Sequence, residues 1–176
     1  MGLAEWLAAG AIVLAVWPIF QMVWGRPDIS FAFNRINGSV DTHLFVHLYN
    51  LPIPWRFLAS IGVRRDEAKF HVGIIIKHAD GNMLLRFSDP PPGSGNPYHQ
   101  NLLSLSSGLS PHTLEILGAN GKCARTYTEN RKDSFYEYAP GTYGARIEVF
   151  VGEKMFYEER SFVVTHNPIH SYWADN

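Results

Sequence analysis

The residues best suited to chemistry in this chain are its eight histidines, two pairs of which have the spacing H-x-x-x-H. On a helix, residues four apart are neighbours and can share one zinc ion. His43 and His47, however, lie in a segment that alternates like a strand, which separates them by about 13 Å. His166 and His170 lie in a tail interrupted by Pro168, so no helix supports that pair. We therefore assign no metal site.

Two glycine-containing segments resemble nucleotide-binding loops only in part. Gly93-Ser94-Gly95 begins like a dinucleotide fingerprint, but Tyr98 replaces the third glycine and prolines, rather than a strand, precede it. Residues 118–123 resemble a phosphate loop, but their glycines are too close together and Cys123 stands where Ser or Thr would hold Mg²⁺. Both segments are predicted to be turns, and no cofactor-binding residue is assigned.

The lone cysteine, Cys123, excludes an intramolecular disulfide. A small core residue is the interpretation we favour for it, with a reactive thiol as the alternative. No nucleophile-elbow motif occurs, and no carboxylate pair has surroundings that would separate two pKa values. No catalytic residue is therefore assigned.

Trp55, Arg56 and Phe57 form the one candidate for a partner-binding site. Aromatic rings next to arginine are enriched at protein-interface hot spots. An exposed arrangement would contact a protein partner or a membrane surface. Because the whole stretch 52–61 is apolar, we expect instead that its rings fill the open end of the folded domain, and the stretch itself is compatible with a short helix or a strand.

Residues 6–24, WLAAGAIVLAVWPIFQMVW, contain no charged side chain and are long enough to span the roughly 30 Å hydrocarbon core of a bilayer as a helix. Trp6 and Trp24 stand at the two ends, where indole rings favour the headgroup level. Pro18 would kink a membrane helix rather than forbid it. The segment is predicted to be a membrane anchor.

Two other interpretations of this segment fit less well. A cleaved signal peptide would have a basic start and small residues before its cleavage site, whereas residues 1–5 lack Lys and Arg and residues 17–24 are bulky. A buried core helix would have a polar stripe. We expect domain boundaries of 1–26 for the anchor and 27–176 for one globular domain.

The side of the membrane on which the globular domain lies is predicted from only two basic residues. Arg26 and Arg35 come after the segment and no basic residue precedes it, so the positive-inside rule predicts a cytoplasmic domain. A glycosylation sequon at residues 37–39 would require the opposite, extracellular or periplasmic, orientation.

Short strands separated by turns are predicted over most of the remaining chain. The clearest turn is Asp80-Gly81, which suits a tight hairpin, and the clearest strand alternates from Tyr143 to Val151. The expected strands are residues 29–33, 42–51, 69–78, 83–87, 113–117, 122–127, 143–151 and 155–165. Residues 89–101 are predicted to be a Pro- and Gly-rich loop. Antiparallel strands without intervening helices predict a mainly β sandwich.

The segment 135–143, FYEYAPGTY, followed by an alternating strand, resembles the penultimate strand of immunoglobulin-like domains, including bacterial fibronectin-type and PKD-like modules. The resemblance covers about thirty residues. It implies an immunoglobulin-like sandwich in which the Tyr143 hydroxyl bonds to nearby backbone. The cysteine pair and mid-domain tryptophan of antibody domains are absent. The resemblance implies no particular ligand.

Charge adds one exclusion. The net charge is −1, and because Glu5 is the only charged residue before Gly25, the globular part has 15 acidic and 15 basic residues. No nucleic-acid partner is expected. The sequence thus predicts a single-pass, membrane-anchored binding or scaffolding module with a protein partner and no catalysis. The alternatives are a tethered enzyme with a histidine and carboxylate site, or a small subunit of a membrane complex whose helix packs through Ala8, Ala11 and Ala15.

Overall fold

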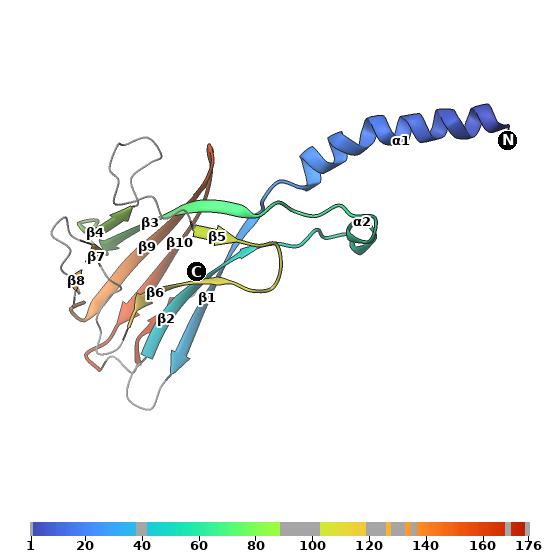
Figure 1. Cartoon of the computed structure of the whole chain (residues 1–176). Coiled ribbons are helices and arrows are strands. Elements are labelled where there is room, and N and C mark those ends of the chain that lie inside the picture. Colours follow the sequence, from blue (N-terminus) through green and yellow to red (C-terminus); the bar gives the residue numbers. More distant parts are fainter. Residues whose placement is uncertain are drawn as a thin grey trace.

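The computed structural model describes residues 2–37, 42–88, 103–118, 126–127, 133–134, 137–167 and 170–174. It is mainly β, with one long N-terminal helix that projects away from the strands (Figure 1). The helices are α1 (Leu3–Trp24) and α2 (Arg56–Ser60). The strands are β1 (Ile29–Asn37), β2 (Thr42–Asn50), β3 (Ala68–His78), β4 (Met83–Ser88), β5 (Leu103–Leu105), β6 (His112–Leu117), β7 (Thr126–Tyr127), β8 (Asp133–Ser134), β9 (Gly141–Val151), β10 (Lys154–Val164) and β11 (Tyr172–Trp173).

Two antiparallel sheets face each other across the main core. One sheet has the order β1-β2-β6, and the other has the order β11-β10-β9-β3-β4, with β5 also paired to β3. The two strands β7 and β8 pair with each other. The predicted antiparallel sandwich is therefore confirmed, and the alternating patterns explain it: every second side chain of β2 and β9 is buried between the sheets.

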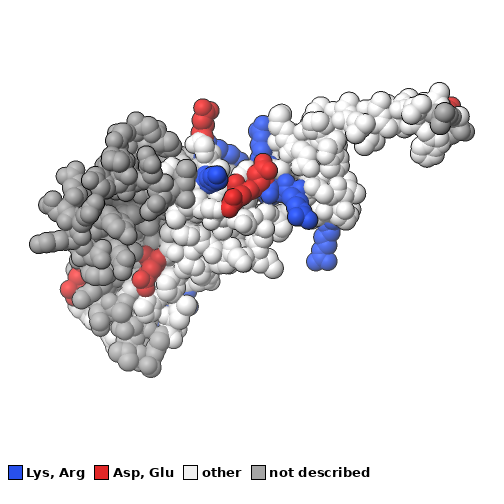
Figure 2. All heavy atoms as spheres, viewed as in Figure 1, with Lys and Arg blue, Asp and Glu red and all other residues white. Residues whose placement is uncertain are grey.

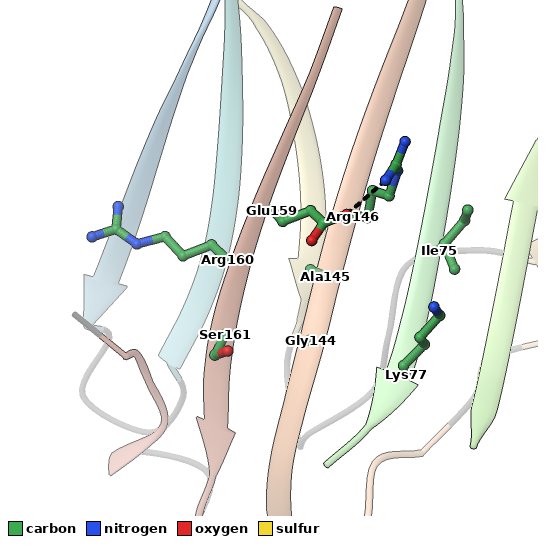
Figure 3. Close-up of a pocket in the computed structure, with 8 residues that line it drawn as sticks. All are labelled: Ile75, Lys77, Gly144, Ala145, Arg146, Glu159, Arg160 and Ser161. Carbon is green, nitrogen blue, oxygen red and sulfur yellow. Dashed lines mark hydrogen bonds and ion pairs between the residues drawn. The ribbon is translucent and has the colours of Figure 1, made fainter. Parts of the chain in front are cut away.

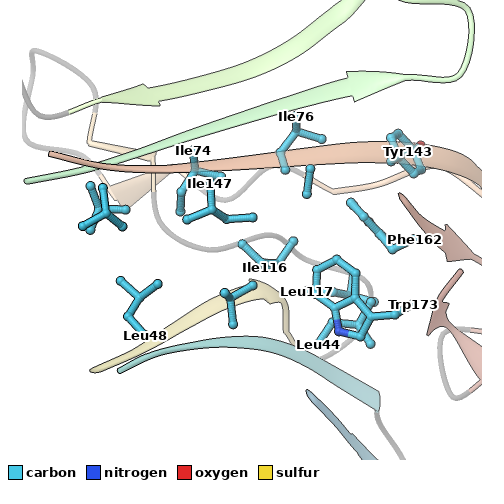
Figure 4. Close-up of a cluster of buried hydrophobic side chains, with 14 of the residues drawn as sticks. Leu44, Leu48, Ile74, Ile76, Ile116, Leu117, Tyr143, Ile147, Phe162 and Trp173 are labelled. Atoms are coloured by element: carbon cyan, nitrogen blue, oxygen red, sulfur yellow. The ribbon is translucent and has the colours of Figure 1, made fainter. Parts of the chain in front are cut away.

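The main core combines aliphatic side chains from both sheets with an aromatic cluster at one end (Figure 4). Tyr143 and Phe162 stack with ring centroids 5.4 Å apart, and both are almost fully buried. Trp173 lies edge-on to Phe162, and its indole nitrogen donates to the Asn34 carbonyl at 3.0 Å. The last strand thereby ties the C-terminal tail to β1 of the opposite sheet.

The expected tyrosine bond is present. The Tyr143 hydroxyl donates to the Ala139 carbonyl, four residues earlier, at 2.6 Å. Because Tyr143 is buried, this bond satisfies the polarity of its phenol hydroxyl inside the core.

Seven of the eight strand predictions are confirmed, with ends that differ by at most two residues except that β1 continues from the predicted end at Phe33 to Asn37. The Asp80-Gly81 turn does connect β3 to β4, with Gly81 at a φ of +87°. Residues 122–125 of one predicted strand lie outside the described residues, as do Cys123, Gly93-Ser94-Gly95 and residues 38–39 of the sequon. The three short strands β5, β8 and β11 were not predicted.

α1 continues through Pro18 as one helix. From Ala4 to Trp24 it is long and apolar enough to cross a membrane, and it is exposed along nearly its whole length. Only Trp17, Gln21 and Trp24 are partly covered. These three positions share one helical face, which is the face turned to the folded domain.

Candidate functional site at the neck

The connection between helix and sandwich, residues 24–28 together with 51–67, is here called the neck. Its second segment leaves β2, forms the single turn α2 and returns to β3. Figure 1 shows α2 projecting from the sandwich on the same side as α1. The neck therefore brings together two segments that are far apart in the sequence.

A small apolar core of its own holds the neck together. Ile53, Leu58 and Val63 are buried, and Trp17 and Trp24 of α1 pack against them. This cluster is separate from the sandwich core. It converts an otherwise exposed helix into an element with a defined direction relative to the strands.

Hydrogen bonds reinforce this packing. The Asp66 amide donates to the Gly25 carbonyl at 2.7 Å, and the Val63 amide to the Leu58 carbonyl at 3.0 Å. Gly25 is required here, since a Cβ atom at this position would lie 2.4 Å from the Gln21 carbonyl oxygen and 3.3 Å from that of Arg64.

Asn50, at the end of β2, is the buried polar centre of the neck. Its Oδ1 accepts from the Asp28 amide at 3.2 Å. Its Nδ2 donates to the carbonyls of Asp66 at 2.9 Å and Leu105 at 3.2 Å. The side chain thus links the segment after α1, the segment before β3 and β5, and its burial makes each of these bonds costly to lose.

The structure corrects our expectation for Trp55 and Phe57. Their rings do not fill the end of the sandwich: Trp55 is 51% exposed and Phe57 59% exposed, and Ile61 beside them is 55% exposed. The Trp55 ring lies between two others, 4.9 Å from Trp24 and 5.8 Å from Phe57 between ring centroids. Packing is instead supplied by Ile53, Leu58 and Val63, because a five-residue helix can bury only one face.

The three rings Trp24, Trp55 and Phe57 are here called the aromatic platform, and Figure 2 shows both basic and acidic side chains where the helix meets the sandwich. Arg65 is mostly buried, donating from Nη1 to the Arg26 carbonyl at 2.8 Å and from Nη2 to the Asp28 carboxylate at 3.3 Å. Arg56 and Arg64 make no ion pair with any residue that the structure describes.

A hollow of about 630 Å³ opens between these groups. Its apolar part comes from the loop around α2, and its polar part from arginines, two serines and one carboxylate. The lining residues are Pro52, Ile53, Pro54, Arg56, Ala59, Val63, Arg64, Arg65, Glu67, Ser106 and Ser107. The Glu67 carboxylate accepts a hydrogen bond from the Ser104 hydroxyl.

A second, smaller hollow of about 240 Å³ lies over the outer face of the six-stranded sheet, above Gly144 (Figure 3). Arg146 there donates to Glu159 and to Glu148, each at 2.7 Å, and these hydrogen bonds raise the pKa of Arg146. Neither hollow is lined by a histidine. Neither hollow therefore has the histidine and carboxylate composition of the enzyme alternative.

The two histidines of the first pair, His43 and His47, have separate partners. On the outer face of β2, His43 Nδ1 lies 2.7 Å from the Glu115 carboxylate and His47 Nδ1 lies 2.8 Å from the Thr113 hydroxyl. The ring of Phe45 stands between the two imidazoles and stacks on both. Within the described part of the chain, no three His, Cys, Asp or Glu residues come close enough to hold a metal ion.

Comparison of the chain with protein-family models, with curated proteins and with solved structures gives no match.

Proposed function

We propose that this protein is a single-pass membrane protein that holds an immunoglobulin-like binding or scaffolding module against the membrane surface. The observation that carries the proposal is the neck. An exposed apolar helix packs through Trp17 and Trp24 against the neck residues Ile53, Leu58 and Val63, and the aromatic platform lies beside its last turn. Indole rings at this level are typical of membrane–water interfaces.

Two features support the immunoglobulin-like assignment. In such folds one sheet contains strands A, B and E and the other strands C, F and G. The sheets β1-β2-β6 and β10-β9-β3 have the corresponding sequence order, with β4 added beside β3. Tyr143 at the start of β9 occupies the position of the tyrosine corner at the start of strand F.

An anchor, rather than a cleaved signal sequence, is favoured by the contacts of α1. A signal sequence leaves the mature protein and has no packing role in it. Here the end of α1 supplies two indoles to the small core of the neck, so removal would expose Ile53, Leu58 and Val63. Retention of the helix completes this core.

The cytoplasmic side is favoured by the arginines. Arg26 and Arg35 come two and eleven residues after Trp24, and no basic residue precedes the helix. Basic residues near the end of a membrane helix are retained on the cytoplasmic side. Labelling of Cys123 with a membrane-impermeant thiol reagent tests this orientation. Intact and permeabilised cells are treated separately, and each sample is denatured after its treatment. We expect reaction only after permeabilisation, and reaction in intact cells would reverse the orientation.

The binding role is tested by cross-linking the full chain in its native membranes. The variant Trp55→Ala/Phe57→Ala removes the exposed rings, and Met155→Ala/Tyr157→Ala removes exposed apolar side chains from β10 as a matched control. We expect a specific cross-linked protein with the wild type and the control, and its loss with the first variant. No cross-linked protein, together with substrate turnover by the purified chain, would overturn the proposal in favour of a tethered enzyme.

A further inference from the structure

We propose that the hollow in the neck binds the headgroup of an anionic phospholipid from the membrane that α1 crosses. The inference rests on the proposed membrane attachment and adds a ligand to it. Three features of the neck carry the inference: the composition of the hollow, the unpaired arginines that line the hollow, and the position of the hollow beside the aromatic platform.

The hollow is amphipathic in the same sense as a phospholipid. Pro52, Pro54 and Ala59 give it an apolar wall that matches the glycerol and upper acyl region. Ser106 and Ser107 give it hydroxyl groups that can donate to phosphate oxygens. A volume of about 630 Å³ is in the range of ordinary small-molecule sites, and a phospholipid headgroup is a ligand of that size class.

The charges favour an anion. Among the described residues, Arg56 and Arg64 line the hollow without a carboxylate partner, whereas the one lining carboxylate, Glu67, is bonded by Ser104. Arg65 has its charge matched by Asp28, but its buried Nε has no hydrogen-bond partner. Two free guanidinium groups and an unsatisfied donor therefore remain, and guanidinium groups bind phosphate through paired N–H bonds.

The aromatic platform indicates where the hollow lies relative to the membrane surface. Trp17, which packs on the neck, is two helical turns from Trp24, so the α2 loop lies alongside the last turns of the apolar helix. With Phe57 and Ile61 exposed beside it, the α2 loop reaches the interfacial layer. The arginines of the hollow are then at phosphate level, where each is attracted to an anionic surface. This commits the site to a lipid rather than to a free anion.

The experiment uses the full chain in mixed micelles of phosphatidylglycerol and phosphatidylcholine, with retained lipid identified by native mass spectrometry. The test variant is Arg56→Gln/Arg64→Gln. The matched control is Arg35→Gln/Lys77→Gln, which removes two cations from the far ends of β1 and β3. Thermal unfolding of all three proteins confirms that the sandwich is intact.

We expect the wild type and the control to retain phosphatidylglycerol over phosphatidylcholine, and the test variant to lose about tenfold or more of that preference. Equal retention of both lipids by the wild type, or equal loss in both variants, would overturn the proposal. Displacement of the lipid by inorganic phosphate alone would also overturn it, by indicating a simple anion site. Failure of every version of the chain to remain in micelles would instead contradict the membrane attachment itself.

Discussion

The indole rings of Trp24 and Trp55 pack against each other with centroids 4.9 Å apart, one at the end of the membrane-spanning candidate helix and the other in the loop before α2. This contact joins the two segments of the neck. It places the aromatic platform beside the helix rather than at the end of the sandwich, and the proposals above depend on it.

The contribution of this pair is measurable with a double-mutant cycle on Trp24→Ala and Trp55→Ala. Aromatic pairs contribute about 0.5–1.5 kcal/mol beyond their burial, so we expect a coupling energy of about 1 kcal/mol. The measurement is native-state hydrogen exchange at the Val63 amide, which bonds to Leu58 within the neck. Additive effects of the two substitutions would mean that the rings do not hold the neck closed.

Substitution of Gly25 with alanine is expected to disrupt the neck, because its methyl group would meet the Gln21 carbonyl oxygen at 2.4 Å. The matched control is Gly10→Ala in the middle of α1, where an added Cβ meets nothing within 4 Å beyond the backbone of its own helix. Limited proteolysis of the full chain in micelles is the measurement. We expect faster cleavage within residues 51–67 for Gly25→Ala only; equal rates in both variants would contradict the packing described for Gly25.

Asn50→Asp is expected to destabilise the fold by about 2–4 kcal/mol, because it replaces a buried donor to two carbonyls with an oxygen that faces them. The volume of the side chain is unchanged, so packing effects are small. Asn34→Asp, at an exposed position of β1, is the control. Chemical unfolding measures both, and a loss below about 0.5 kcal/mol for Asn50→Asp would show that the neck does not depend on this network.

A pH dependence is expected from His112. Burial lowers the pKa of this imidazole, whose ring lies edge-on to Phe70 at 5.6 Å. The folded state therefore binds its proton less readily than the unfolded state, so its contribution to stability is complete above about pH 6.5 and is lost as the pH falls. In His112→Phe, we expect the free energy of unfolding to fall less between neutral and mildly acid pH than in the wild type. Parallel curves would exclude a role for His112.

The sandwich could be predicted because its long strands alternate. Residues 42–50 and 141–151 bury every second side chain, so their apolar positions mark the core directly. The strand β11 could not be predicted in this way, because two residues are too few to show an alternation of apolar and polar side chains. β11 forms because Trp173 packs against Phe33 of one sheet and Phe162 of the other.

The neck could be predicted only in its parts. The anchor and the apolar stretch 52–61 are both evident in the sequence, and the three candidate residues Trp55, Arg56 and Phe57 do lie in the site. What local patterns do not contain is the contact between the two segments. Trp17 and Trp24 of the helix cover Ile53, Leu58 and Val63. Trp55 and Phe57 stay exposed, although we expected their rings to fill the end of the domain.

The most direct test of the account is the intact mass of the protein recovered from cell membranes after alkaline carbonate extraction. Membrane attachment through α1 predicts a carbonate-resistant chain whose mass includes residues 3–24. A soluble chain that lacks those residues would contradict it, because α1 would then be a cleaved signal sequence and the neck would lose the two tryptophans that complete its core.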